Sequence, residues 1–359
     1  MKRFTKLALL AAAAAIFAGA FAGVALAKDT LIVANIYDAK TLDPIATNDV
    51  ATSGMCLHVY DNLLALGPDG KPVPQLAEKY EIVDNLTYKF SLRKGVKFHN
   101  GEEMKAADVK YTFERAKTPA GASIRQYVDD IDTIEAIDDY TVVFKMKRPF
   151  TPFLMALTHT CGSILNKKAV EAAGDSYGMN PVGTGPFKFK SWAKGDRITL
   201  ERNEEYWGKK PAYKTLVMRS IPEATNRTIE LESGAIDIAY QITTNDLKRV
   251  QGNPKLSLMR VVDNSTTYMG LNCSKPPFDN VKVREDVSLA LDTVGIQKAV
   301  WRGVGKAPVA PIAPNILYAI KDAKPHVQDV EKATKLLAEA GGKLPLNVQI
   351  WTNERKERI

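Results

Sequence analysis

The hydrophobic period of the chain changes within residues 86–115, and this change constrains the fold more than any other feature of the sequence. Residues 88–92 alternate between apolar and polar side chains, which predicts a half-buried strand. A turn at Gly95 and a second short alternating run over residues 96–98 follow, and then another turn. From Ala106 onward the apolar spacing is helical. The stretch therefore predicts strand, turn, strand, turn and helix in that order.

Strand and helix patterns continue along the rest of the chain. Strands are predicted at residues 31–34, 131–136, 141–146 and 346–351, and helices at about 50–64, from 282 onward and at 330–341. Asp329 is the candidate N-cap of the last helix, and Gly341 is the residue expected to stop it.

Residues 180–187 read Asn-Pro-Val-Gly-Thr-Gly-Pro-Phe and predict a tight loop. Its two central glycines permit positive φ angles, and Pro186 stiffens the exit into a strand. Further short motifs are NEEYWG at residues 203–208, GAID at 234–237 and KVR at 282–284. The Tyr206–Trp207 pair favours an aromatic anchor at a strand-to-loop corner.

These motifs, in this order, resemble the extracellular solute-binding proteins of peptide and nickel ABC importers, known as solute-binding family 5. That family carries a run similar to L-R-x-G-V-x-F-H-x-G followed by A-x-D-V, which here spans residues 92–109. The resemblance covers residues 28–359 and is closest to dipeptide-binding members. It implies an α/β, two-lobed periplasmic-binding-protein fold (a Venus flytrap) with an extra subdomain on lobe I.

The resemblance also implies domain boundaries. They are lobe I at residues 28–74 and 185–262, an inserted subdomain at 75–184, and lobe II at 263–359. Relatives begin a long helix where this sequence stops at Ile359, so lobe II is expected to be incomplete, in a fragment or a prematurely ended gene.

Two residues depart from the family pattern. Lys105 stands where relatives often have a capping Thr, and Asp286 stands where they have a small apolar residue. Loss of a helix cap costs ~0.5–2 kcal/mol unless another group replaces it. Both departures are therefore expected to lower stability slightly without removing the fold.

The first 27 residues have the pattern of a cleavable signal peptide. Lys2, Arg3 and Lys6 form a positive start, an apolar run covers residues 7–24, and Ala-Leu-Ala at 25–27 fits a cleavage site. The alternative is an uncleaved membrane anchor, but the Ala and Gly content makes the run only weakly hydrophobic. We therefore expect export to the periplasm.

The charge distribution argues against a nucleic-acid-binding protein. The formal net charge is +8, but basic residues are scattered among acidic ones. A nucleic-acid-binding surface would show a basic stripe with interleaved aromatic residues. A soluble protein with a mixed surface is the expected class.

The reactive residue types show no catalytic or metal-binding spacing. Three cysteines, Cys56, Cys161 and Cys273, lie among apolar neighbours and are expected to be buried, although one disulfide between any two is possible. No His has a second ligand at metal-site spacing, and no nucleophile motif is present. We therefore expect no catalysis, no metal and no cofactor.

The resemblance implies the periplasmic solute-binding component of an ABC importer. It binds short peptides, dipeptides or oligopeptides, in a cleft between the lobes, and passes them to membrane permease subunits with their ATPases. A monomer is expected. Eight residues face the cleft by their position against the family: Thr47, Asn48, Asp49, Thr184, Gly185, Tyr240, Tyr268 and Asn272. Asn48 and Asp49 could instead be turn residues, Tyr268 a core residue, and the 180–187 loop a structural turn.

Three other functions stay open at this point. The same fold could bind a nickel chelate, haem, glutathione or an opine. The chain could be a non-functional truncated remnant. A secreted hydrolase is the alternative from a different class of protein. The sequence shows no nucleophile placed beside a base, as such an enzyme requires.

Overall fold

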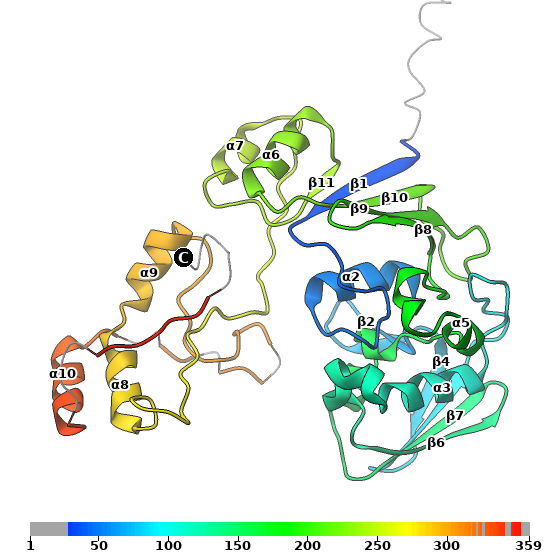
Figure 1. Ribbon diagram of the computed structural model, residues 1–359, viewed down its shortest axis with the longest axis horizontal. Coiled ribbons are helices and arrows are strands. Elements are labelled where there is room, and N and C mark those ends of the chain that lie inside the picture. The colour runs from blue at the N-terminus through cyan, green and yellow to red at the C-terminus, as the bar shows by residue number, and fades with distance from the viewer. Residues whose placement is uncertain (1–27, 317, 321, 325–326, 342–345, 353–359) are drawn as a thin grey trace, which may run out of the picture. The chain divides into compact units, whose positions relative to one another are not determined.

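The computed structural model describes residues 28–316, 318–320, 322–324, 327–341 and 346–352 of the 359-residue chain (Figure 1). The chain divides into two compact units, Met1–Gln241 and Ile242–Ile359. The signal peptide expected at residues 1–27 lies outside the described residues. The lobe and subdomain boundaries given above stay predictions.

The first unit contains a five-stranded sheet with strand order β11-β1-β10-β9-β8. Its strands are β1 (Thr30–Asn35), β8 (Phe187–Ala193), β9 (Arg197–Arg202), β10 (Thr215–Ser220) and β11 (Ile238–Ala239). β1 runs parallel to both of its neighbours, whereas β8, β9 and β10 pair antiparallel. Because β1 lies inside the sheet between parallel partners, it reads as a continuous apolar run rather than an alternating one.

A second, antiparallel sheet of the same unit has the order β4-β5-β7-β6. Its strands are β4 (Ala77–Ile82), β5 (Thr87–Leu92), β6 (Ile131–Asp138) and β7 (Thr141–Met146), and helix α3 (Ala106–Ala116) packs against β6 and β7. Phe144 is the centre of its aromatic core, with ring centroids 5.5 Å from Phe90, 5.0 Å from Phe113 and 5.4 Å from Phe153. The alternation predicted at residues 88–92 is confirmed, since Tyr88, Phe90 and Leu92 are buried.

The other elements of the first unit are short. They are α2 (Val50–Val59), α4 (Phe153–Ala156), α5 (Lys167–Ala173), α6 (Ala224–Ser233), the 3₁₀ helices η1 (Pro119–Tyr127), η2 (Thr160–Gly162) and η3 (Gly174–Met179), and the paired strands β2 (Leu64–Leu66) and β3 (Pro72–Pro74). One cluster of buried apolar residues runs from the five-stranded sheet through α2 to the four-stranded sheet. The two sheets of this unit therefore share one core.

Two predicted elements of the first unit are corrected. The strand expected at residues 96–98 is reduced to a single bridge between Lys97 and Glu103, although Val96 and Phe98 are buried. Helix α2 ends at Val59 rather than near residue 64, because the chain turns there and Leu64 starts β2.

Lys105 is the N-cap residue of α3, at the position that the family resemblance implied. Other groups take the place of the threonine hydroxyl that caps this helix in relatives. The Asp108 carboxylate accepts a hydrogen bond from the Lys105 backbone N–H at 3.0 Å. The Lys105 ammonium lies 3.0 Å from Glu103 and 3.4 Å from Asp139, above the Tyr140 ring. The departure at Lys105 is thus locally compensated.

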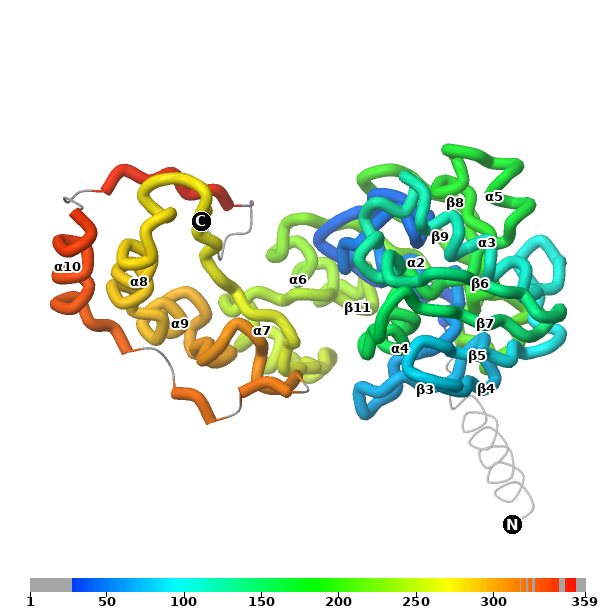
Figure 2. Tube along the Cα trace, turned by 90° about the horizontal axis from the view of Figure 1, so that it is seen from below, coloured from blue at the N-terminus to red at the C-terminus, as the bar shows by residue number. Residues whose placement is uncertain are grey.

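The second unit contains four described helices, α7 (Leu247–Gly252), α8 (Val281–Ala290), α9 (Thr293–Trp301) and α10 (Val330–Glu339). Helices α8 and α10 lie side by side (Figure 2), and a salt bridge of 3.0 Å joins Lys282 to Glu339. The predicted Asp329 cap of α10 is confirmed, since its carboxylate accepts a hydrogen bond from the Lys332 N–H at 2.9 Å. Gly341 follows the helix with a φ of 74°, as expected of a stop.

Two expectations for the second unit are wrong. Residues 346–351 form no strand among the described residues, because no neighbouring segment pairs with them. Cys273 is exposed, whereas Cys56 and Cys161 are buried as expected, and all three thiols are unpaired.

Asp286 lies on the buried side of α8, where burial raises the pKa of its carboxyl.

Within the described part of the chain, no helix combines the length and the apolar character that a membrane crossing requires.

Candidate functional site

Three of the predicted site residues surround the N-terminus of α2. Asp49 is its N-cap: one carboxylate oxygen accepts a hydrogen bond from the Thr52 N–H at 2.9 Å, and the other accepts one from the Thr47 hydroxyl at 2.7 Å. Burial would raise the pKa of Asp49, but the hydrogen bonds from Thr52 and Thr47 outweigh it and lower the pKa. Thr47 is buried and Asn48 is exposed. Asn48 is therefore the residue of the three that presents its side chain to solvent.

Thr184 and Gly185 lie at the opposite end of α2, in the 180–187 loop. The Gly185 N–H donates a hydrogen bond to the Val59 carbonyl at 2.9 Å. A Cβ atom on Gly185 would lie 2.5 Å from the Val59 carbonyl carbon, and one on Gly183 would lie 2.1 Å from the Val59 oxygen. Neither glycine has a positive φ, so the expectation of positive φ is wrong. The loop requires glycine because its backbone touches the end of α2.

Asp61 follows that end of α2 and is the centre of a buried hydrogen-bond network. Its carboxylate accepts hydrogen bonds from the Thr184 hydroxyl at 3.1 Å, Gln75 Nε2 at 2.9 Å, the Tyr206 hydroxyl at 3.0 Å and Trp207 Nε1 at 2.8 Å. Burial raises the pKa of Asp61 to about 6, although these hydrogen bonds act in the opposite direction. The network connects four separate segments of the first unit through one carboxylate.

His99 holds the same loop from the other side. Its Nε2 lies 3.0 Å from the Gly185 carbonyl oxygen, and its Nδ1 accepts a hydrogen bond from the Gly183 N–H at 3.3 Å. This pair of contacts requires the neutral imidazole with its proton on Nε2. Burial lowers the pKa of His99 to about 4, and the positive charge of Lys188 adds to this effect. His99 therefore acts as a neutral clamp on the loop.

Tyr240 follows β11 and is 55% exposed. Its backbone is fixed by Arg227 of α6, a fully buried residue. Arg227 Nε donates a hydrogen bond to the Tyr240 carbonyl at 3.1 Å, and Nη2 donates one to the Gln241 carbonyl at 3.0 Å. Nη1 donates to the carbonyls of Ile221 at 2.6 Å and Pro222 at 3.0 Å. The exposed phenol thus stands on a rigidly held backbone.

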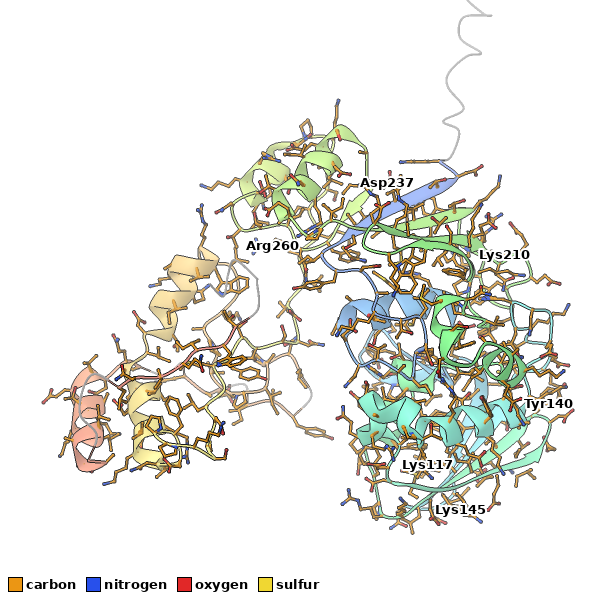
Figure 3. The ribbon with its side chains drawn as sticks, in the orientation of Figure 1. Lys117, Tyr140, Lys145, Lys210, Asp237 and Arg260 are labelled. Atoms are coloured by element: carbon orange, nitrogen blue, oxygen red, sulfur yellow. The ribbon has the colours of Figure 1, made fainter. Side chains whose placement is uncertain are left out.

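Asp237 of the GAID motif ties the strand segment before Tyr240 to β1 (Figure 3). Its carboxylate accepts a hydrogen bond from the Ile32 N–H at 2.8 Å and lies 2.7 Å from the Lys28 ammonium. The motif therefore has a structural role at the edge of the five-stranded sheet.

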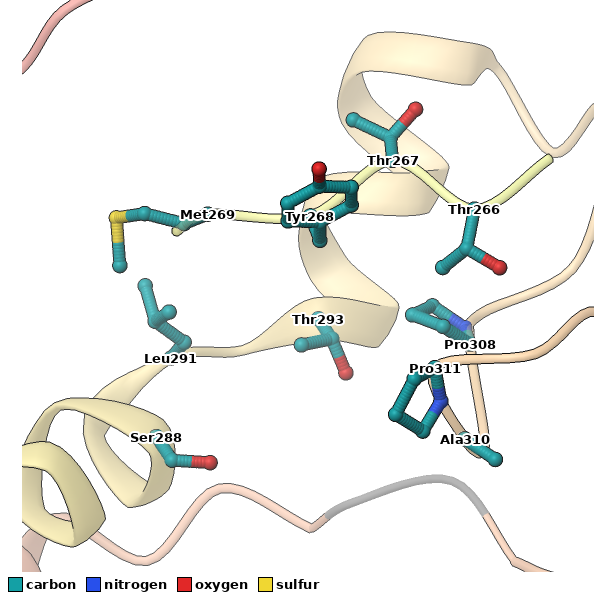
Figure 4. Close-up of a pocket in the computed structure, with 10 residues that line it drawn as sticks. All are labelled: Thr266, Thr267, Tyr268, Met269, Ser288, Leu291, Thr293, Pro308, Ala310 and Pro311. Atoms are coloured by element: carbon teal, nitrogen blue, oxygen red, sulfur yellow. The ribbon is translucent and has the colours of Figure 1, made fainter. Parts of the chain in front are cut away.

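The last two predicted site residues belong to the second unit. Tyr268 is 83% exposed and forms part of the wall of a cavity of about 520 Å³ (Figure 4). Asn272 is exposed, and its amide oxygen accepts hydrogen bonds from the Ser274 hydroxyl at 2.7 Å and the Ser274 N–H at 3.1 Å. Tyr268 is thus not a core residue, and Asn272 stabilises a turn.

The predicted residues fall into separate places within their units. Thr47, Asn48 and Asp49 meet at one end of α2, and Thr184 and Gly185 pack against its other end. Thr184 is completely buried, and its hydroxyl is bonded to Asp61. That these residues contact a solute stays a prediction.

Among the described residues, no group of three or more His, Cys, Asp or Glu side chains is arranged to hold a metal ion. Burial raises the pKa of the Cys161 thiol to about 12 and that of Cys56 further still, so neither forms a reactive thiolate at neutral pH.

Asp61, His99 and Arg227 were not singled out as functional residues from the sequence. His99 belongs to the F-H-x-G part of the family run, which was the available signal. Asp61 and Arg227 carry no motif of their own, and their partners lie elsewhere in the sequence, with Thr184 123 residues from Asp61.

Comparison with known proteins gives a family. The model of the bacterial extracellular solute-binding proteins, family 5 Middle, matches residues 71–357. The glutathione-binding protein GsiB of Escherichia coli O1:K1 / APEC is 31% identical over 336 residues, which are 92% of this chain and 65% of that protein. The chain thus spans less than two thirds of the length of this relative.

Two solved structures share the fold. The periplasmic binding protein DppA from Helicobacter pylori, in complex with the peptide STSA, has a TM-score of 0.79 and 32% identity, over 87% of this chain and 66% of that one. NikZ from Campylobacter jejuni, in complex with Ni(L-His), has a TM-score of 0.78 and 27% identity, over 88% and 64%. The predicted α/β periplasmic-binding-protein fold is confirmed by these likenesses. The chain belongs to the bacterial extracellular solute-binding proteins of family 5.

Proposed function

We propose that this protein is the periplasmic solute-binding component of an ABC importer and that its solute is a short peptide. The likeness to DppA bound to the peptide STSA carries the proposal, because it combines 32% identity with a TM-score of 0.79. The protein binds without chemical turnover and acts as a monomer. Its partners are permease subunits with their ATPases.

In this function, exposed side chains are the candidates to contact the peptide. Asn48 and Tyr240 serve on the first unit, and Tyr268 serves on the second. Asp49, Thr184 and Gly185 contribute mainly by holding the backbone around α2. Loose side-chain preference is expected where water fills the space around the bound peptide.

Glutathione is the second candidate solute. The 31% identity to GsiB over 92% of this chain favours it, and glutathione is itself a modified tripeptide. The two candidates differ in the first peptide bond, which in glutathione runs through the side chain of glutamate. A protein that recognises ordinary peptide backbones should therefore separate them.

Calorimetric titration of the protein purified after export distinguishes these solutes. The panel contains the peptide STSA, the dipeptide Ala-Leu, glutathione and Ni(L-His), and mass analysis of the solute follows each titration. We expect heat with the peptides and recovery of intact peptide. Heat with glutathione alone would favour the second candidate. Cleaved peptide, or binding of Ni(L-His) alone, would contradict the proposal.

We further propose that residues 1–27 are a signal peptide removed on export, so that the mature protein begins at Lys28. The positive start, the apolar run and the Ala-Leu-Ala site support this proposal. N-terminal sequencing of the exported protein tests it. A product that keeps Met1 and sediments with membranes would contradict it.

A further inference from the structure

Helices α8 and α10 of the second unit pack side by side and run antiparallel (Figure 2). At one end of the pair, the Lys282 ammonium near the start of α8 lies 3.0 Å from Glu339 at the end of α10. At the other end, the Asp329 N–H, at the N-cap of α10, donates a hydrogen bond to the Leu289 carbonyl at 2.9 Å. The two helices are therefore joined at both ends.

Asp286 lies on the side of α8 that faces α10. It follows Lys282 by four residues and precedes Leu289 by three, so it stands on one stripe of the helix between two residues that contact α10 or its cap. Asp286 is only 8% exposed. The buried residues of α10 are apolar, Ala333 and Leu337. The carboxyl group is therefore enclosed in an apolar seam between two helices.

No charged group compensates this carboxyl among the described residues. Burial is the single cause that raises the pKa of Asp286, and its side chain forms no hydrogen bond or ion pair with another described residue. The four charged residues within α10 are exposed: Glu331, Lys332, Lys335 and Glu339. Arg284 of α8 donates its hydrogen bonds to the carbonyls of Phe278 and Asp279, and the Asp329 carboxylate accepts one from the Lys332 N–H.

A buried carboxyl without a partner is far less costly in its neutral form than as an ion. While Asp286 carries a proton, the seam between the helices can stay closed. When the proton leaves, the carboxylate gains free energy by contact with water, and it reaches water when the two helices separate. A ligand from outside would need the same opening, because the chain's own helices cover the group.

We propose that Asp286 makes the α8–α10 helix pair a proton-operated clasp, which is closed when the carboxyl carries a proton and opens when it is ionised. A carboxyl whose pKa is raised on folding gives stability that is complete below its ordinary value of 3.8 and lost as the pH rises through the raised value. The clasp thus responds to pH in the opposite direction to His99 of the first unit. It goes beyond the proposed function, because it does not depend on the solute.

Hydrogen-exchange mass spectrometry of the protein purified after export, at pH 7 and pH 4, tests the clasp. Protection factors correct for the intrinsic pH dependence of exchange. Over α8 and α10, the ratio of protection at pH 4 to that at pH 7 should be at least about threefold higher in wild type than in Asp286→Asn. The salt bridges of the pair weaken with acid in both proteins, so this comparison cancels them. At pH 7 the Asn variant should be protected at least about threefold more than wild type.

An equal acid response in wild type and Asp286→Asn would overturn the clasp, whatever solute the protein binds. Asp279→Asn is the matched control, because Asp279 is exposed and immediately precedes the N-cap of α8. It should keep the wild-type response, and a response lost in this control as well would contradict the assignment to Asp286.

Asp286→Ala keeps the inference testable if the Asn variant does not fold. It removes the carboxyl and leaves a small apolar side chain in the seam. The acid response of α8 and α10 should disappear in this variant too, with protection at pH 7 again above that of wild type. A response that survives in folded Asp286→Ala would show that another group titrates, and the inference would be wrong.

Discussion

His99 is neutral in the folded protein because both ring nitrogens are used by the loop that carries Thr184. Its folded pKa of about 4 lies below the ordinary value of 6.5. The unfolded chain therefore binds a proton more readily between these two pH values, and His99 contributes stability that is complete above pH 6.5 and lost as the pH falls toward 4. The contribution amounts to about 3 kcal/mol.

We predict that wild type loses about 3 kcal/mol more unfolding free energy between pH 7 and pH 4 than His99→Gln does. Gln keeps an amide donor and acceptor but does not titrate. Asp61 has a raised pKa and acts with the opposite sign, and it cancels because both proteins contain it. Urea unfolding at the two pH values measures the difference. Equal losses in the two proteins would show that His99 does not control this pH dependence.

Asp61→Asn tests the network behind the same loop. Each carboxylate oxygen of Asp61 accepts hydrogen bonds from two donors. In the Asn variant, an amide nitrogen replaces one of these oxygens, and it cannot accept a hydrogen bond from either donor. We predict a loss of about 2 kcal/mol or more in unfolding free energy at pH 7. The exposed Asp69→Asn is the control and should change it by less than about 0.5 kcal/mol. A loss for Asp61→Asn as small as that of the control would contradict the network.

Single residues were partly predictable from the sequence. The loop at 180–187 was found because glycine and proline leave a local signature. The predicted reason for its glycines, a positive φ angle, was wrong. Their Cβ positions are blocked by Val59, which lies far away in the sequence. Local pattern cannot show such a contact, and for the same reason Asp61 gave no signal.

At the scale of elements, an alternating pattern predicted a strand correctly in one segment and wrongly in another. Residues 141–146 pair with β5 on one side and β6 on the other. Residues 346–351 alternate equally well, but no strand pairs with them among the described residues. A strand forms only when a neighbour satisfies its backbone groups, and the sequence of one segment does not contain that neighbour.

Arg227 of α6 donates hydrogen bonds to four backbone carbonyl groups. Two belong to Tyr240 and Gln241, after β11, and the other two belong to Ile221 and Pro222, before α6. A lysine ammonium cannot reach four acceptors in this fork geometry. We predict that Arg227→Lys lowers the unfolding free energy by about 2 kcal/mol or more. Amide exchange over residues 238–241 should rise at least about tenfold.

Urea unfolding and hydrogen-exchange mass spectrometry measure both effects. The control is Arg197→Lys, because Arg197 is half exposed and pairs with its neighbour Asp196. It should change stability by less than about 0.5 kcal/mol. Exchange that rises equally throughout the first unit would show a general loss of stability and would contradict a local clamp at Tyr240.

For the whole molecule, the order and spacing of several motifs predicted the family and the fold class, and both are confirmed. Each motif alone has a structural explanation. The Asp237 carboxylate accepts a hydrogen bond from the backbone of β1, and Trp207 donates one to the Asp61 carboxylate. The solute could not be predicted in the same way. Relatives with the same framework bind a peptide in one case and Ni(L-His) in another, so the framework residues do not carry this information.

Several large apolar side chains of the second unit are almost fully exposed. Met259, Val261 and Trp351 are 87%, 90% and 85% exposed. Contiguous exposed apolar surface marks an interaction site or promotes association. We predict that residues 28–359 bind the dye ANS in the folded state and that the double variant Val261→Lys with Trp351→Lys binds about half as much.

Val50→Lys is the matched control for this prediction, because Val50 is 89% exposed but lies in the first unit. It should leave the dye fluorescence unchanged, since a single exposed apolar residue forms no patch. Circular dichroism before each titration shows whether the variants keep their secondary structure. Dye fluorescence that falls equally in the control and in the double variant would mean that the bound surface is not in the second unit. A double variant that binds as much dye as wild type would mean that these side chains do not form the patch.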